Sequence, residues 1–208
     1  MTFDHRGFGQ SVITNDDAPG LHFAHDLRSL LDHLNIPHAT IVGQSMGGWT
    51  ALGCALRFPE RVQQLVLCDT HGGLHSDEIA ALWQASLVEM ATLPAGIHPA
   101  AGERMLREQP ALHFLYQQIA ALNPPASLAV GPWLVTAGHT PLARASDVPV
   151  PVLLIAGEED RVIPVSVLKM AASAFPAGQI AFVPRAGHSA YFERAETVNA
   201  LIEQFLGS

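Results

Sequence analysis

The sequence predicts an α/β fold in which a mostly parallel sheet carries helices on both faces. Three observations support this prediction. Short apolar runs of strand length alternate with amphipathic segments of helical length. The strand-like runs are continuously apolar, as is typical of strands buried on both faces of a parallel sheet. Hydrophobic residues make up 49% of the 208 residues, which is enough for one substantial core.

The elements expected before residue 70 follow this alternation. Apolar side chains at helical spacing define the first helix, and Asn35 and Pro37 end it. A loop at 4–11, rich in glycine, precedes it. In order, the sequence predicts the end of a strand at 1–3, a helix at 22–34, a strand at 38–42, a helix ending before Pro59 and a strand at 62–68.

The stretch 71–146 differs in character, because strand-like runs are absent from it. Prolines separate its helical patterns. Strand patterns return afterwards, each followed by a helical pattern. The predicted elements are helices at 76–93, 102–109 and 111–122, a strand at 150–156, a helix to about 175, a strand at 179–183 and an amphipathic helix to about 205.

The segment Gly43-Gln44-Ser45-Met46-Gly47 lies between a predicted strand and a predicted helix and has the pattern G-x-S-x-G. A serine on such a sharp turn is pushed out of the sheet, and its backbone is crowded. Gly43 and Gly47 are expected to remove Cβ atoms that would clash there. The free N–H groups at the start of the helix then face whatever the serine attacks.

This segment resembles the nucleophile elbow of the α/β-hydrolases, particularly small esterases and enol-lactone hydrolases with a Gly-x-Ser-Met-Gly-Gly elbow. The loop from Asp4 resembles the D-x-R-G-x-G-x-S loop of that family, in which the residues matching Asp4 and Arg6 brace loops. The resemblance implies an α/β-hydrolase sheet that is N-terminally truncated, since nothing matches strands one to three. It makes 71–146 a helical cap insertion, with the core formed by 1–70 and 147–208.

A serine hydroxyl needs a base to take its proton and an acid to orient that base. Ser45, Asp160 and His188 occur in the order typical of α/β-hydrolases, and each follows a predicted parallel strand. The turn Ala186-Gly187-His188 resembles the catalytic histidine turn of the family, and Asp160 matches the acid in its G-x-x-D-x-x-x-P pattern. Other carboxylates that could orient the histidine are those of Glu158, Glu159 and, in reserve, Asp69.

The backbone N–H of Met46 is the expected donor to the oxyanion of the transition state. In the family, a second donor comes from a loop after strand three that often begins His-Gly, and no such segment precedes Asp4. The stretch His71-Gly72-Gly73 resembles it superficially but follows a different strand, so it is a weak substitute.

Composition argues against several other classes of function. The chain has 11 Lys and Arg against 19 Asp and Glu, a net charge of −8, which disfavours nucleic acid and anionic membranes as partners. No apolar run reaches about 18 residues and no export signal is visible, so a cytoplasmic location is expected.

Cys54 and Cys68 are expected to be small buried hydrophobes. Two histidine pairs have metal-ligand spacing, but no further ligands cluster nearby, so solvated or capping roles are favoured for His22, His25, His71 and His75.

These inferences predict a hydrolase that cleaves a small carboxylic ester or lactone through a Ser-His-Asp triad and an acyl-enzyme intermediate. The resemblance implies no cofactor, and no metal is expected. The predicted partner is a small-molecule substrate, and a homo-oligomer is possible through the unpaired edge of the sheet. Carbon–carbon bond hydrolysis and cofactor-free peroxidation use the same triad and stay open. The alternative, a function that is not enzymatic, is a non-catalytic remnant of the fold that serves as a binding module.

Overall fold

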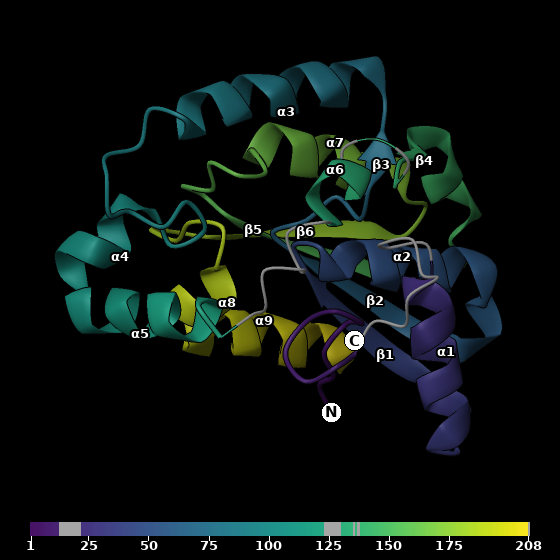
Figure 1. Ribbon diagram of the computed structural model, residues 1–208. Helices are drawn as coiled ribbons and strands as arrows, with labels where there is room; N and C mark the ends of the chain where they lie inside the picture. Colours follow the sequence, from purple (N-terminus) through teal and green to yellow (C-terminus); the bar gives the residue numbers. More distant parts are fainter. Residues whose placement is uncertain (13–21, 123–129, 135, 137, 208) are drawn as a thin grey trace.

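The computed structural model describes residues 1–12, 22–122, 130–134, 136 and 138–207. Four parallel strands form its central sheet in the order β1–β2–β5–β6 (Figure 1). Every residue of β5 is buried, as expected for an inner strand of a parallel sheet covered on both faces. The predicted fold class is therefore confirmed. The strands are β1 (Ala39–Gln44), β2 (Val62–Cys68), β5 (Val152–Gly157) and β6 (Gly178–Val183).

Two apolar cores lie on opposite faces of the sheet, because successive strand side chains point to opposite sides. Leu65 and Leu67 of β2 belong to the larger core, and Val66 and Cys68 belong to the smaller one. Figure 1 shows α2 and α7 on one face and α9 on the other. The helices of the hydrolase core are α1 (Phe23–His33), α2 (Gly47–Arg57), α7 (Val165–Ala174), α8 (Ala190–Glu193) and α9 (Ala195–Leu206).

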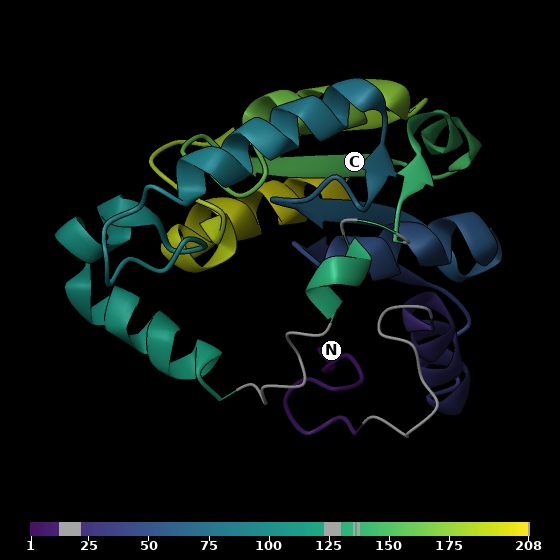
Figure 2. The same ribbon diagram turned by 45° about the horizontal axis from the view of Figure 1, so that its top comes forward.

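The segment between β2 and β5 is mostly helical. Figures 1 and 2 show α4 and α5 together at the end of the molecule where α8 also lies. The prediction that 71–146 contains no strand is wrong, because β3 and β4 form a short parallel pair. Strands of two residues have too few positions to show periodicity. The elements are β3 (Leu74–His75), α3 (Asp77–Met90), α4 (Gly102–Glu108), α5 (Pro110–Ala120), α6 (Val130–Leu134) and β4 (Thr140–Pro141).

The N-terminal segment departs from the prediction, since residues 1–3 form no strand. Within the described part of the chain, β1 pairs with β2 alone and is an edge strand. Its Val42 is 52% exposed, because the smaller core beneath α9 does not extend under β1. The final helix also differs from the prediction, because it is divided at Arg194 into α8 and α9.

The loop after Phe3 is held to the first two helices by side chains. The Arg6 guanidinium forms an ion pair with the Asp26 carboxylate in α1, with Nε 2.6 Å from Oδ2. His5 Nε2 lies 2.8 Å from Thr50 Oγ1 in α2. Asp4 Oδ2 accepts a hydrogen bond from the Gln10 amide at 3.4 Å, within the loop. These contacts confirm the bracing role expected of Asp4 and Arg6.

Candidate active site

Ser45 occupies the tight turn between β1 and α2 with a φ of +48°, in the left-handed region that non-glycine residues rarely adopt. Such a residue carries strain of roughly 1–3 kcal/mol and persists only where its surroundings hold it. The Ser45 amide donates to the Cys68 carbonyl at the end of β2, at 3.1 Å. The turn is thereby fixed to the neighbouring strand.

The glycines around Ser45 have unequal roles. A Cβ at Gly43 would lie 2.6 Å from the Gly47 carbonyl oxygen, so glycine is required there. A Cβ at Gly47 would meet nothing within 4 Å, so the prediction that a side chain would clash at that position is wrong. The backbone lies close to a neighbouring side chain one residue later, at Gly48, where a Cβ would lie 2.4 Å from Thr70 Oγ1.

The side chains of Ser45, His188 and Asp160 form one hydrogen-bonded chain. Ser45 Oγ lies 2.7 Å from His188 Nε2, and His188 Nδ1 lies 2.9 Å from Asp160 Oδ2. Asp160 Oδ1 accepts hydrogen bonds from the amides of Val162 and Ile163 at 2.7 and 3.0 Å. The Asp160 side chain is fully buried and that of His188 is 4% exposed. Both oxygens of the Asp160 carboxylate are therefore engaged, which holds it in one orientation.

The other candidate carboxylates make different contacts. Glu159 accepts from Arg104 Nε at 2.7 Å, and Glu158 is exposed. Asp69 is fully buried, but its two oxygens accept from the amides of Gly157 and Ala190 at 2.8 and 3.1 Å. Of these carboxylates, Asp160 is the one that contacts the His188 ring.

Sequence reasoning missed the groups that hold the histidine loop. Glu193 Oε1 accepts from the Gly187 amide at 2.9 Å, and Asp69 holds the Ala190 amide on the other side of His188. Gln44 Nε2 donates to the His188 carbonyl at 2.9 Å. Burial raises the pKa of both carboxyl groups, Asp69 and Glu193, to about 7. Only the adjacency of Gln44 to Ser45 could have suggested such a role from the sequence.

The pKa of His188 results from opposing influences. Burial alone would lower it, but the charge and hydrogen bond of Asp160, together with the charge of Asp69, outweigh burial and raise it above the usual histidine value. The protonated imidazolium is therefore favoured beside these carboxylates. A base that has taken a proton from Ser45 would be stabilised in the same way.

Met46, the expected oxyanion donor, is the N-cap residue of α2. Amides at a helix start have no acceptor within the helix, so the Met46 N–H is available to a ligand. The His71-Gly72-Gly73 stretch, a weak candidate for the second donor, uses the amides of both its glycines internally. The Gly72 amide donates to Thr70 Oγ1 at 3.1 Å and the Gly73 amide to His71 Nδ1 at 3.0 Å.

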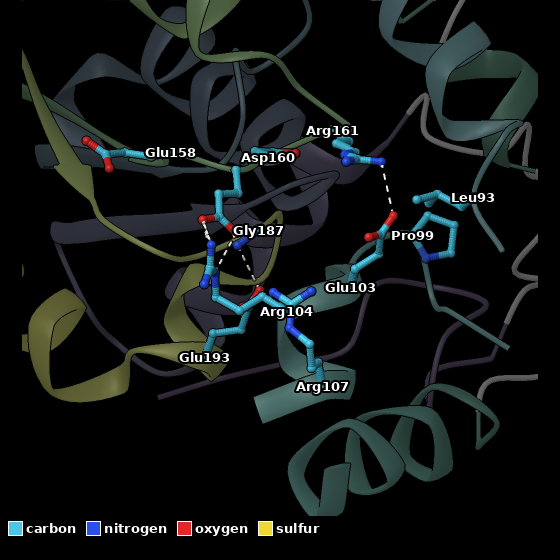
Figure 3. A pocket seen from close by; sticks show the side chains of 11 residues that line it. Leu93, Pro99, Glu103, Arg104, Arg107, Glu158, Asp160, Arg161, Gly187 and Glu193 are labelled. Carbon is cyan, nitrogen blue, oxygen red and sulfur yellow. Dashed lines mark hydrogen bonds and ion pairs between the residues drawn. The ribbon is translucent and has the colours of Figure 1, made fainter. Parts of the chain in front are cut away.

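A cavity of about 440 Å³ lies beside Asp160, between α4 and the loops after β5 and β6 (Figure 3). Its described lining includes Asp160 and Gly187, but neither Ser45 nor His188. Ion pairs cross it: Arg104 binds Glu159, and Arg161 lies 3.4 Å from Glu103. These pairs connect α4 to the residues on either side of Asp160. The nucleophile and the base therefore do not line this cavity.

The two cysteines and several histidines outside the hydrogen-bonded chain are buried or packed against other rings. Cys54 and Cys68 are free and buried, as predicted. The described residues contain no group of three or more His, Cys, Asp or Glu side chains that could hold a metal ion. His71 is not solvated, because it is 1% exposed; its Nδ1 instead caps the Gly73 amide at 3.0 Å, in line with the capping role predicted as the alternative. His75 stacks on His139, with ring centroids 4.1 Å apart.

A family model described as the alpha/beta hydrolase fold matches residues 1–195. The chain belongs to the α/β hydrolase fold family. Its fold, its Ser45 turn and its hydrolase relatives agree with this assignment, and they indicate an α/β-hydrolase enzyme. No helix of the described residues in this α/β hydrolase is long and apolar enough to cross a membrane.

Similar proteins include enzymes of several specificities. The α/β hydrolase is 29% identical over 226 residues to a 2-hydroxy-6-oxononadienedioate/2-hydroxy-6-oxononatrienedioate hydrolase of Comamonas testosteroni, a match that covers 99% of this chain and 76% of the relative. It resembles the structure of a thermophilic esterase from Thermogutta terrifontis with a TM-score of 0.77, 26% identity and coverage of 98% and 77% of the two chains. An N-acyl homoserine lactone degrading enzyme has a TM-score of 0.75, 27% identity and coverage of 97% and 80%.

Proposed function

We propose that this α/β hydrolase cleaves a small carboxylic ester or lactone through an acyl-enzyme intermediate on Ser45. The observation that carries the proposal is the hydrogen-bonded chain from Ser45 Oγ through His188 to the buried Asp160 carboxylate, with distances of 2.7 and 2.9 Å. Similarity to an esterase and to a lactone-degrading enzyme supports the choice of bond.

The reaction follows from this arrangement in two halves. His188 Nε2 accepts the Ser45 hydroxyl proton while Oγ attacks the ester carbonyl, and the Met46 N–H donates to the oxyanion that develops. The tetrahedral intermediate collapses, the alcohol leaves with the proton held by His188, and an acyl group stays on Ser45. Water then attacks the acyl carbonyl with His188 again as the base, and the carboxylic acid is released. Asp160 keeps the proton of the neutral imidazole on Nδ1, so that Nε2 is free to accept one.

A fluorophosphonate probe tests the proposal because it labels activated serines. We expect labelling of the parent protein at Ser45, and loss of labelling in Ser45→Ala and His188→Ala. Ser173→Ala is the matched control, since Ser173 lies at an exposed position in α7. A folded parent protein that stays unlabelled would support the non-catalytic binding module instead.

Carbon–carbon bond hydrolysis is a second candidate, favoured by the 29% identity to the Comamonas testosteroni hydrolase. The same serine and histidine would serve a substrate whose scissile bond joins a carbonyl to carbon. Turnover of a 1,5-diketone that exceeds turnover of matched esters and lactones would favour this candidate.

The pH dependence of kcat/KM should reflect the raised pKa of His188. The histidine must be neutral to accept the Ser45 proton, so activity falls as pH decreases through its pKa. Because burial is outweighed by the neighbouring carboxylates, this acidic limb should lie above the ordinary histidine value of about 6.5. A pH profile with 4-nitrophenyl acetate measures the limb, and a midpoint below that value would contradict the electrostatic assignment.

A further inference from the structure

Four charged side chains form a continuous series of ion pairs beside the active site. Glu159 binds Arg104, Arg104 binds Glu108 at the next turn of α4, and Glu108 binds Arg185. Arg104 Nε lies 2.7 Å from Glu159 Oε2, and Arg104 Nη1 lies 2.9 Å from Glu108 Oε1. Arg185 Nη2 lies 2.6 Å from Glu108 Oε2. We call these four residues the ion-pair network. Its two central members come from α4, in the segment between β2 and β5.

The two ends of the ion-pair network lie on the loops that carry Asp160 and His188. Glu159 directly precedes Asp160 in the loop after β5, and Arg185 comes three residues before His188 in the loop after β6. Side chains of α4 are therefore bound to both loops. The network joins the same two loops as the hydrogen bond between His188 and Asp160.

The two loops also lie against each other through their backbones. The Glu159 amide donates to the Ala186 carbonyl at 2.9 Å. A Cβ at Gly157 would lie 2.2 Å from the Gly187 carbonyl oxygen, so the loops are in close contact there. Glu159 thus contacts the histidine loop with its amide and α4 with its carboxylate. A displacement of Glu159 would move the adjacent Asp160 relative to the histidine loop.

Arg104 is the central cation of the ion-pair network. Its Nε and Nη2 both donate to the Glu159 carboxylate, and this two-point contact fixes the relative orientation of the two groups. The Arg104 side chain is 23% exposed, so most of it is withdrawn from water. Its hydrogen bonds hold the pKa of Glu159 below the usual value, which keeps that carboxylate ionised near neutral pH. Glu159 is therefore held to α4 by geometry as well as by charge.

The magnitudes favour a role in catalysis over a role in folding. The side chains of the ion-pair network are partly exposed, and exposed ion pairs contribute little to the free energy of unfolding. Catalysis is more sensitive to position, because a displacement of about 1 Å can reduce a rate about 10²-fold. The contact that the two loops determine is the one between His188 Nδ1 and Asp160 Oδ2, at 2.9 Å.

We infer that Arg104 is a positioning residue, which keeps Asp160 aligned with His188 by joining their loops through the ion-pair network. The inference rests on the proposed function, since that reaction uses both side chains. The guanidinium of Arg104 donates to the Glu159 and Glu108 carboxylates, so its effect reaches the reacting groups through these two residues.

Steady-state kinetics of Arg104→Gln with a short 4-nitrophenyl ester is the first test. We expect kcat to fall about tenfold with little change in KM, because the base is misaligned while the substrate loses no contact. Arg185→Gln interrupts the same network at its other end and should have the same effect. Since both changes break one connection, the double variant should be little worse than either single variant. The thermal unfolding temperature should be nearly unchanged.

Arg107→Gln is the matched control. Arg107 belongs to α4 and lines the same cavity as Arg104 (Figure 3). Within the residues that the structure describes, Arg107 forms no ion pair. The control therefore removes the same charge from the same helix without breaking the ion-pair network, and its kcat should equal that of the parent.

The pKa of His188 gives a readout that lower stability alone would not change. The charge and hydrogen bond of Asp160 raise this pKa, as does the charge of Asp69. If Arg104→Gln loosens the contact with Asp160, the pKa of His188 should fall. If loss of the positive charge were the whole effect, the two glutamates left behind would favour the imidazolium, and the pKa should rise. Nuclear magnetic resonance of ¹³C-labelled histidine measures the titration, and His188→Asn assigns the signal. The signal of His98, whose pKa is lowered in part by His188, is followed in the same spectra.

Several outcomes would overturn the inference. They are an unchanged kcat in Arg104→Gln, an equal loss of kcat in Arg107→Gln, and a pKa of His188 that is unchanged or raised in Arg104→Gln. The titration needs no turnover, so it separates the inference from the proposed function. A protein that fails fluorophosphonate labelling but shows the fall in pKa would lose the proposed function and keep the positioning role of Arg104.

Discussion

Ser45→Ala, His188→Ala and the double variant are expected to have nearly equal activity toward a short 4-nitrophenyl ester, each about 10³-fold or more below the parent. The physical reason is that the two groups act as one unit. Ser45 Oγ and His188 Nε2 are 2.7 Å apart, and neither the hydroxyl nor the base is useful without the other. Removing the second group therefore adds little to the loss caused by the first.

Steady-state kinetics on the four proteins measures this non-additivity. Ser173→Ala again serves as the control for serine substitution at an exposed helical site. Thermal unfolding of each variant separates loss of catalysis from loss of fold. Substantial activity in Ser45→Ala, or losses that multiply in the double variant, would contradict the proposed nucleophile and base.

The sequence was most informative where function depends on local backbone geometry. The G-x-S-x-G turn combines a strand, a strained serine and a helix start within a few residues, so its pattern is visible without knowledge of the fold. The order of Ser45, Asp160 and His188, each after a strand, was sufficient to predict that they meet, since the carboxyl ends of parallel strands share one edge. The distances among them agree with that prediction.

Features set by contacts between distant segments could not be predicted. Asp69 holds amides 88 and 121 residues away in sequence, and no local pattern indicates such partners. The strand expected at 1–3 failed for a related reason, because a strand needs a neighbour, and the described residues provide none for that segment.

The segment between β2 and β5 contacts the loop that carries His188. Tyr116 of α5 accepts a hydrogen bond from Ser189 Oγ at 2.9 Å, directly after His188. The insertion therefore contacts the histidine loop. Changes in its sequence should alter substrate preference without altering the three residues of the hydrogen-bonded chain.

Asp160→Asn is expected to lower turnover on the order of 10⁴-fold while the protein stays folded. Asp160 Oδ1 accepts from the amides of Val162 and Ile163, so the carbonyl oxygen of an asparagine would keep that position. Its NH₂ group would then face His188 Nδ1, which lies 2.9 Å from Oδ2 in the parent. The imidazole would have to accept at Nδ1 and carry its proton on Nε2, where it cannot take the proton of Ser45.

Asp69→Asn is the matched comparison, because this buried carboxylate also lies close to the histidine loop. Its two oxygens accept from Gly157 and Ala190, and an amide can satisfy only one of these donors. We therefore expect a loss of folding stability of about 1–3 kcal/mol and a small effect on turnover. Severe loss of turnover in Asp69→Asn with a mild effect of Asp160→Asn would show that Asp69 is the catalytic acid.

The pH dependence of stability separates the two carboxylates further. The pKa of Asp69 is raised to about 7, so between about pH 4 and pH 7 the folded state retains a proton that the unfolded state has lost. Stability from this group therefore falls as pH rises through that interval, and the asparagine variant lacks this fall. Urea unfolding at pH 5 and pH 8 should show a smaller deficit for Asp69→Asn at pH 8. A deficit that grows with pH would mean that Asp69 is ionised throughout, and that its charge supports His188 more directly than its contacts indicate.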